Sequence, residues 1–134
     1  MRLTVLLPVS HSATPGTVAL TVLIVDDHPS FRASARAILE SDGFDVVGEA
    51  EDGASALTAV RELDPDVVLL DVQLPDASGI DLCRFICELG SLPAVVLVSS
   101  RDASDYDGLI GSIPARGFIS QADLSGEALR ALLA

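Results

Sequence analysis

Short aliphatic runs that alternate with amphipathic stretches constrain the fold of this chain more than any other feature of its sequence. Three runs of four aliphatic residues occur at 22–25, 67–70 and 95–98. Runs without a polar position are typical of parallel strands that are covered on both faces. Two less apolar segments, near 45–47 and 116–119, suit the edges of the same sheet. Strands that alternate in this way with helices predict an α/β fold.

Apolar side chains at helical spacing mark the segments between these strands. Phe31, Ala35, Ile38 and Leu39 lie at i, i+4, i+7 and i+8, which places them on one helix face. Gly43 can end that helix in a left-handed conformation. Four further helices are predicted over 54–63, 78–89, 103–111 and 124–133.

The length and composition indicate one domain. A chain of 134 residues can bury enough apolar surface to fold without disulfides. Residues 1–20 are rich in small and turn-forming residues and are expected to be a flexible leader, with the domain at 21–134. No apolar run is long enough for a membrane helix, and Pro8 interrupts the short run that resembles a signal peptide. We therefore expect a soluble, cytoplasmic protein.

The charge of the chain excludes several classes of function. It holds 20 acidic and 8 basic residues, for a formal net charge of −12. Such a charge repels nucleic acids and anionic membranes, so direct binding to either is not expected. All the basic residues are arginine, and mechanisms that need a lysine ammonium or Schiff base are therefore excluded.

Polar residues follow each of the three aliphatic runs. Asp26 and Asp27 come after the first, Asp71 after the second, and Ser99 and Ser100 after the third. The carboxyl ends of neighbouring parallel strands line one crevice, so these side chains should converge there. Carboxylates so close together need a cation, and oxygen ligands suit Mg²⁺. Phosphate chemistry is therefore the leading hypothesis.

Simpler interpretations of some of these residues stay open. Asp26 and Asp27 could merely cap the next helix, with His28 and Pro29 opening its first turn. His28 is expected to be a helix-start residue beside the crevice and not a ligand, because imidazole is a poor ligand for Mg²⁺. Two cysteines one helical turn apart, Cys83 and Cys87, are expected to be buried and inert and not a zinc site.

Three phrases of the sequence carry a family resemblance. They are VLIVDDHPSFR at 22–32, VVGEAEDG at 46–53 and DVQLPDASG at 71–79. On these, residues 21–133 resemble the receiver domain of bacterial two-component response regulators, most closely those of the NarL/FixJ subfamily. The resemblance implies a flavodoxin-like, doubly wound, five-stranded parallel sheet of order 2-1-3-4-5. It also implies a signalling switch and not an enzyme.

The resemblance assigns a phosphoryl-acceptor role to Asp71. Its carboxylate would attack a phosphohistidine on a sensor histidine kinase or a phosphotransfer protein. Asp27, Asp71 and the backbone carbonyl of Gln73 would bind Mg²⁺, while Asp26 would act mainly through a metal-bound water. An alternative with the same nucleophile is a Mg²⁺-dependent phosphatase, although Gln73 stands where such an enzyme has a second acid.

The resemblance also assigns the residues that report phosphorylation. The Ser99 hydroxyl would move to a phosphoryl oxygen, and the aromatic ring of Phe118 would turn inward with it. The resemblance also implies a possible homodimer. Its surface would be formed by helix 103–111, strand 116–119 and helix 124–133. The subfamily usually continues into a helix-turn-helix DNA-binding domain, which is not in this sequence, so both a stand-alone receiver and a truncated protein are considered.

One position departs from the family pattern. Gln121 stands where the pattern expects a lysine that pairs with the acceptor carboxylate and then with the phosphoryl group. A neutral amide donates a weaker hydrogen bond than an ammonium, by roughly 1 kcal/mol or more. We therefore expect Asp71 to be phosphorylated slowly, or its phosphorylation to shift the output surface incompletely. The alternative is a pseudo-receiver that signals through protein contacts without phosphate.

Overall fold

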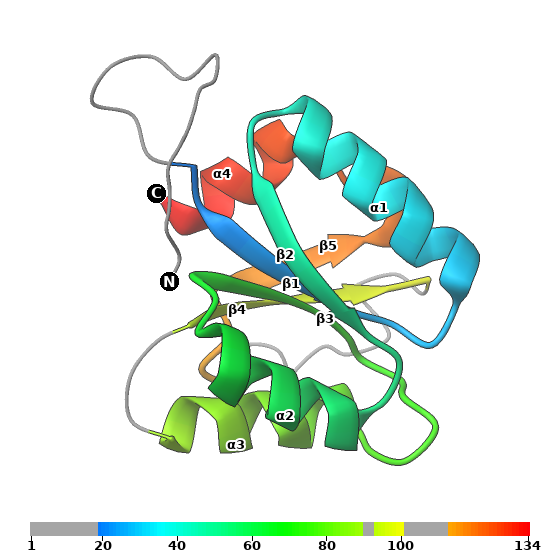
Figure 1. The fold of residues 1–134 in the computed structure, drawn as a ribbon, viewed down its shortest axis with the longest axis vertical. Helices are drawn as coiled ribbons and strands as arrows, with labels where there is room; N and C mark the ends of the chain where they lie inside the picture. The colour runs from blue at the N-terminus through cyan, green and yellow to red at the C-terminus, as the bar shows by residue number, and fades with distance from the viewer. Residues whose placement is uncertain (1–18, 90–92, 101–112) are drawn as a thin grey trace.

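The sheet is the central layer of the domain. In a computed structural model, which describes residues 19–89, 93–100 and 113–134, all adjacent strands pair in parallel in the order β2-β1-β3-β4-β5 (Figure 1). The predicted fold class, strand order and edge strands are therefore confirmed. The strands are β1 (Thr21–Val25), β2 (Asp45–Ala50), β3 (Val67–Asp71), β4 (Ala94–Ser99) and β5 (Gly117–Ser120).

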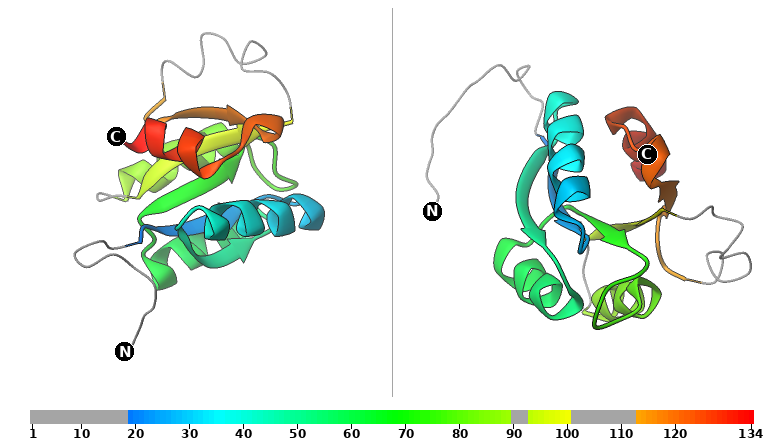
Figure 2. Two further views of the ribbon diagram at one scale, coloured as in Figure 1. Left: turned by 90° about the horizontal axis from the view of Figure 1, so that it is seen from above. Right: turned by 90° about the vertical axis from the view of Figure 1, so that its right-hand side faces the viewer.

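Helices cover both faces of this sheet. The views in Figure 2 place α2 and α3 on one face and α1 and α4 on the other. The described helices are α1 (Pro29–Ser41), α2 (Gly53–Leu63), α3 (Gly79–Glu88), α4 (Gly126–Leu133) and a short 3-10 helix, η4 (Gln121–Asp123). The helix predicted at 103–111 lies outside the described residues. The helix predicted at 124–133 begins two residues later, after Ser125 caps it.

The core has two halves separated by the sheet. Val22, Leu23 and Ile24 of β1 are fully buried although their side chains alternate between the faces, as expected of a central strand. On α1, Ala35 and Leu39 are buried, whereas Ile38 is exposed. Ile38 therefore lies at the margin of the predicted apolar face.

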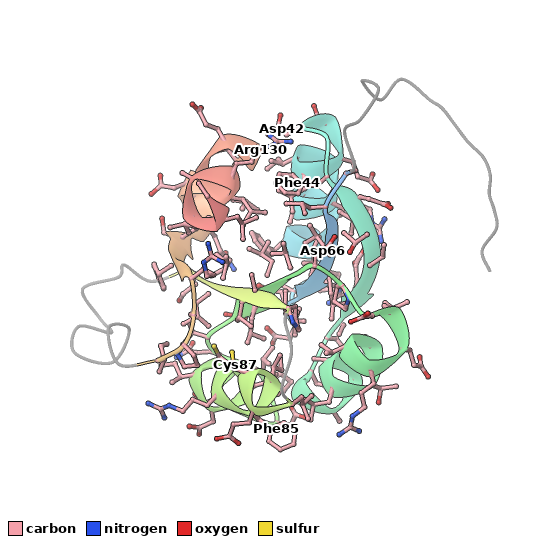
Figure 3. All side chains as sticks on the ribbon, turned by 90° about the vertical axis from the view of Figure 1, so that its left-hand side faces the viewer. Asp42, Phe44, Asp66, Phe85, Cys87 and Arg130 are labelled. Atoms are coloured by element: carbon pink, nitrogen blue, oxygen red, sulfur yellow. The ribbon has the colours of Figure 1, made fainter. Side chains whose placement is uncertain are left out.

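Tight turns connect the layers as the sequence predicted. Gly43, just past α1, has φ of 95°, a left-handed conformation that glycine adopts without strain. At the same end of α1, the carboxylate of Asp42 accepts a hydrogen bond of 2.7 Å from the backbone of Gly126 at the start of α4. Arg130 donates to the Asp42 carbonyl and lies 4.5 Å from the centre of the Phe44 ring (Figure 3). These contacts join the end of α1 to α4 on the same face of the sheet.

The two cysteines on α3 differ in environment. Cys83 is fully buried, and burial raises the pKa of its thiol to about 12. Cys87 is partly exposed, with its Sγ 3.9 Å from the carbonyl oxygen of Pro114. The expectation of a buried, inert thiol is thus confirmed for Cys83 alone. Within the described ranges no helix is both long and apolar enough to cross a bilayer.

Candidate functional site

Acidic side chains meet at the carboxyl edge of the sheet, as the sequence predicted. Asp26 and Asp27 follow β1, and Asp71 is the last residue of the neighbouring β3. One ligand atom from each of these residues and from His28 lies within 4.8 Å of all the others. Ser99 ends the next strand, β4, and is buried. The strand ends therefore bring together Asp26 and Asp71, which are 45 positions apart in the sequence.

A hollow of about 280 Å³ opens over this cluster. Asp71 lies in its wall, and Ser100 and Gln121 come from the neighbouring strand ends. Its lining residues are Asp27, His28, Asp71, Gln73, Leu74, Pro75, Ser100 and Gln121. Phe118 lies outside it, partly buried, and lines a separate groove of about 470 Å³ between β5 and α4.

Asp26 is the fully buried member of the cluster, and each of its carboxylate oxygens accepts hydrogen bonds. Oδ1 accepts from the backbone N–H of His28 at 2.8 Å and lies 2.9 Å from the His28 Nδ1. Oδ2 accepts from the Nε2 of Gln121 at 3.2 Å. His28 itself is the N-cap of α1 and makes no side-chain cap bond. Helix capping by Asp26 and Asp27 is therefore not the arrangement that the structure shows.

The carboxyl of Asp71 has a strongly raised pKa. Its residue is only 5% exposed, and burial raises its pKa to about 7. The charges of Asp26 and Asp27 act in the same direction, whereas a 3.2 Å hydrogen bond from the backbone N–H of Gln73 lowers the pKa. A carboxylate in this position is stabilised by any cation that enters the hollow.

The loop after Asp71 is held by close backbone packing. Gly79 opens α3 so close to β3 that a Cβ atom there would lie 2.1 Å from the Asp71 carbonyl oxygen. Asp76, within the loop, accepts bonds of 2.7 and 3.1 Å from the backbone N–H groups of Gly53 and Ala54 at the start of α2. Sequence reasoning missed this role of Asp76, since no local pattern links position 76 to a helix 23 residues earlier.

His28 lies beside the crevice at the start of α1, as expected. Its Nδ1 is 3.2 Å from a carboxylate oxygen of Asp27 as well as 2.9 Å from that of Asp26. The hydrogen bond to Asp26, followed by the charge of Asp27, raises the pKa of the imidazole above its usual value. The protonated imidazole is therefore a partial counter-ion of the cluster.

Gln121 reaches the cluster through Asp26. Its amide donates to the Asp26 carboxylate, whereas the Asp71 carboxylate accepts a hydrogen bond from the backbone N–H of Gln73. The chain contains no lysine. Of the described residues that line the hollow or belong to the acidic cluster, only His28 can carry a positive charge beside the three carboxylates.

The donor set suits a hard divalent cation. Three carboxylates converge on one small hollow, one of them buried at 0% exposure and one with a raised pKa. Mg²⁺ prefers oxygen ligands, keeps several waters and takes one or two carboxylates, which is what this site offers. The residues present fit such an ion.

A doubly wound parallel sheet with a crevice at its carboxyl edge defines the class of open α/β domains that bind their ligands at that edge. The sequence matches the family described as response regulator receiver domain over residues 22–130. The chain belongs to this family, whose members are signalling modules and not classical enzymes.

Named relatives and solved structures agree with this assignment. The chain is 45% identical over 91 residues to the DNA-binding response regulator MtrA of Mycolicibacterium smegmatis, covering 66% of this chain and 39% of that protein. It is 36% identical over 121 residues to the nitrate/nitrite response regulator protein NarP of Escherichia coli, covering 87% and 56% respectively. The receiver domain of the putative response regulator NarL from Mycobacterium tuberculosis superposes with a TM-score of 0.74 at 32% identity, covering 86% of this chain and 94% of that one.

The matches to NarP and NarL confirm the predicted NarL/FixJ resemblance. The chain spans 39% of the length of MtrA and 56% of the length of NarP.

Proposed function

We propose that this domain is a phosphorylation-controlled switch in which Asp71 accepts a phosphoryl group. The supporting observation is the buried Asp71 carboxyl, which faces a hollow beside Asp26 and Asp27. An Asp71 Oδ would attack the phosphorus of a phosphohistidine, forming an acyl phosphate as the P–N bond breaks and the imidazole nitrogen retains the electron pair. Such a transfer depends mainly on alignment and charge neutralisation.

Asp27, Asp71 and the carbonyl of Gln73 would hold Mg²⁺, and Asp26 would act through a bound water. The ion would supply positive charge for the phosphoryl oxygens. Asp26 contributes further by fixing the position of His28, whose N–H it accepts. The high pKa of Asp71 means that a neighbouring cation is needed for its full ionisation near neutral pH.

Ser99 and Phe118 are the proposed reporters of the phosphorylated state. Ser99 is buried at the end of β4, and its strand pairs with β5 at Ser120. Phe118, on β5, packs partly against the core half that α2 and α3 cover. A shift of Ser99 toward Asp71 can therefore act on β5 through the paired strand.

We further propose that Gln121 makes this switch slow or incomplete. Its amide is bound to Asp26, and no lysine can provide the missing charge. Gln121→Lys should raise the rate of phosphorylation from a small-molecule phosphodonor, since a charge-assisted bond is about twice as strong as a neutral one. Equal rates and equal conformational responses in the two proteins would contradict this role for Gln121.

Intact-mass measurement after incubation with acetyl phosphate and Mg²⁺ tests the main proposal. We expect an adduct of one phosphoryl group on the wild type and none on Asp71→Ala. Absence of the adduct on a wild type that binds Mg²⁺ would favour the pseudo-receiver. Sustained turnover of a phosphate ester would instead identify a phosphatase.

The partners follow from the same proposal. The phosphodonor would be a sensor histidine kinase or a phosphotransfer protein in the cytoplasm. The surface that includes β5 and α4 would form the homodimer. The net charge of −12 disfavours direct DNA binding by residues 1–134.

A further inference from the structure

An arginine on α1 is bound to the backbone of the acidic loop. The Nη1 of Arg32 donates to the carbonyl oxygen of Asp26 at 2.6 Å, and its Nε donates to Glu49 at 3.0 Å. The side chain of Arg32 is only 16% exposed. Because the Nη1 and Nε atoms both donate hydrogen bonds, the planar guanidinium has a defined orientation.

The backbone on both sides of the Asp26 Cα is thereby tied to two residues of β2. The N–H of Asp26 donates to the carbonyl of Ala50 at 3.0 Å, and the carbonyl of Asp26 accepts from Arg32, which Glu49 holds. The carbonyl belongs to the planar unit that leads to the Asp27 Cα. The direction in which the Asp27 carboxylate leaves the backbone therefore depends on Arg32.

Asp27 needs this support more than Asp26 does. Its side chain is 36% exposed and lies 3.2 Å from the Nδ1 of His28, whose own side chain is 66% exposed. Asp26, by contrast, is held by Gln121 as well as by His28. Of the two carboxylates after β1, the one assigned directly to Mg²⁺ has the weaker side-chain anchoring.

We propose that Arg32 is a positioning residue for the Mg²⁺ site, which orients Asp27 by holding the Asp26 carbonyl. The inference rests on the proposed function, because it assumes that Asp27 is a ligand of Mg²⁺. Residues that orient metal ligands typically change metal affinity by about 10- to 100-fold when they are removed.

The charge of Arg32 and its geometry predict opposite effects. A guanidinium near a divalent cation repels it, so that the loss of charge alone would tighten Mg²⁺ binding. Loss of the planar guanidinium would weaken Mg²⁺ binding even where the charge is kept, as in Arg32→Lys. An ammonium cannot hold Glu49 and the Asp26 carbonyl in the same way.

Arg36 provides a matched control. It lies one turn further along α1 and donates to the other carboxylate oxygen of Glu49 at 2.8 Å. Its remaining contacts, with Glu40 and the carbonyl of Val46, are away from the acidic loop. Arg36→Gln therefore removes an ion pair to Glu49 without freeing the Asp26 carbonyl.

Isothermal titration with Mg²⁺ of the wild type, Arg32→Lys, Arg32→Gln and Arg36→Gln tests the proposal. We expect the dissociation constant to rise about tenfold or more in both Arg32 variants. In Arg36→Gln it should stay within about twofold of the wild type. Should Arg32→Gln not fold, as judged by thermal unfolding in EDTA, the Arg32→Lys variant decides.

The possible results separate the two proposals. Unchanged or tighter Mg²⁺ binding by the Arg32 variants, or equal weakening in Arg36→Gln, would overturn the positioning role. A wild type that binds no Mg²⁺ would overturn the proposed function itself, and the inference with it.

Discussion

The raised pKa of Asp71 predicts that this residue destabilises the metal-free fold at neutral pH. The pKa changes from 3.8 in the unfolded chain to about 7 in the folded one, chiefly through burial. The folded state then binds more protons between these values, so the free energy of unfolding falls as pH rises from about 4 to about 7. At about 1.4 kcal/mol per pKa unit, this shift of about three units corresponds to a loss of about 4 kcal/mol above that range. Asp71→Asn keeps the shape without the charge and should recover this amount.

Urea unfolding in EDTA measures this gain. We expect Asp71→Asn to be more stable than the wild type by about 2 kcal/mol or more at about pH 7.5, and the difference to vanish near pH 4. Mg²⁺ should stabilise the wild type and have little effect on the variant. Asp45→Asn, an exposed position at the start of β2, is the control and should change neither result. An Asp71→Asn protein no more stable than the wild type at neutral pH would refute the reasoning.

Two further predictions concern the loop after Asp71. Gly79→Ala should lower the free energy of unfolding by about 1–3 kcal/mol and slow phosphorylation, because its Cβ would meet the Asp71 carbonyl. A variant as stable and as reactive as the wild type would show that α3 can move aside. Asp76→Ala should lower the free energy of unfolding, measured in urea, by about 1 kcal/mol, because the backbone N–H groups of Gly53 and Ala54 lose their acceptor. The control Asp81→Ala, at an exposed position, should lower it by less. Equal losses would contradict the role of Asp76 at the start of α2.

The fold was predictable because its signals are local. The aliphatic runs at 22–25, 67–70 and 95–98 are typical of buried parallel strands, and the less apolar segments of β2 and β5 were correctly placed at the edges. The convergence of Asp26, Asp27 and Asp71 followed from the same geometry, since carboxyl ends of parallel strands share one edge.

The contacts that support the site could not be predicted in this way. Arg32 and Glu49 are 17 residues apart, and their meeting depends on how α1 crosses β2. Gln121 contacts Asp26 and not Asp71, because it emerges from β5 into a 3-10 turn whose path no periodicity reveals. Side-chain pairs between elements thus require the packed structure, whereas the strand ends do not.

The unequal burial of the two cysteines gives the protein a ready attachment point. A maleimide dye or nitroxide should couple to Cys87 and leave Cys83 unmodified, since the latter is fully enclosed and holds its proton far above neutral pH. Because α3 begins at Gly79, against the backbone of Asp71, a probe on that helix could report changes at Asp71 by fluorescence or electron spin resonance without any prior removal of native thiols.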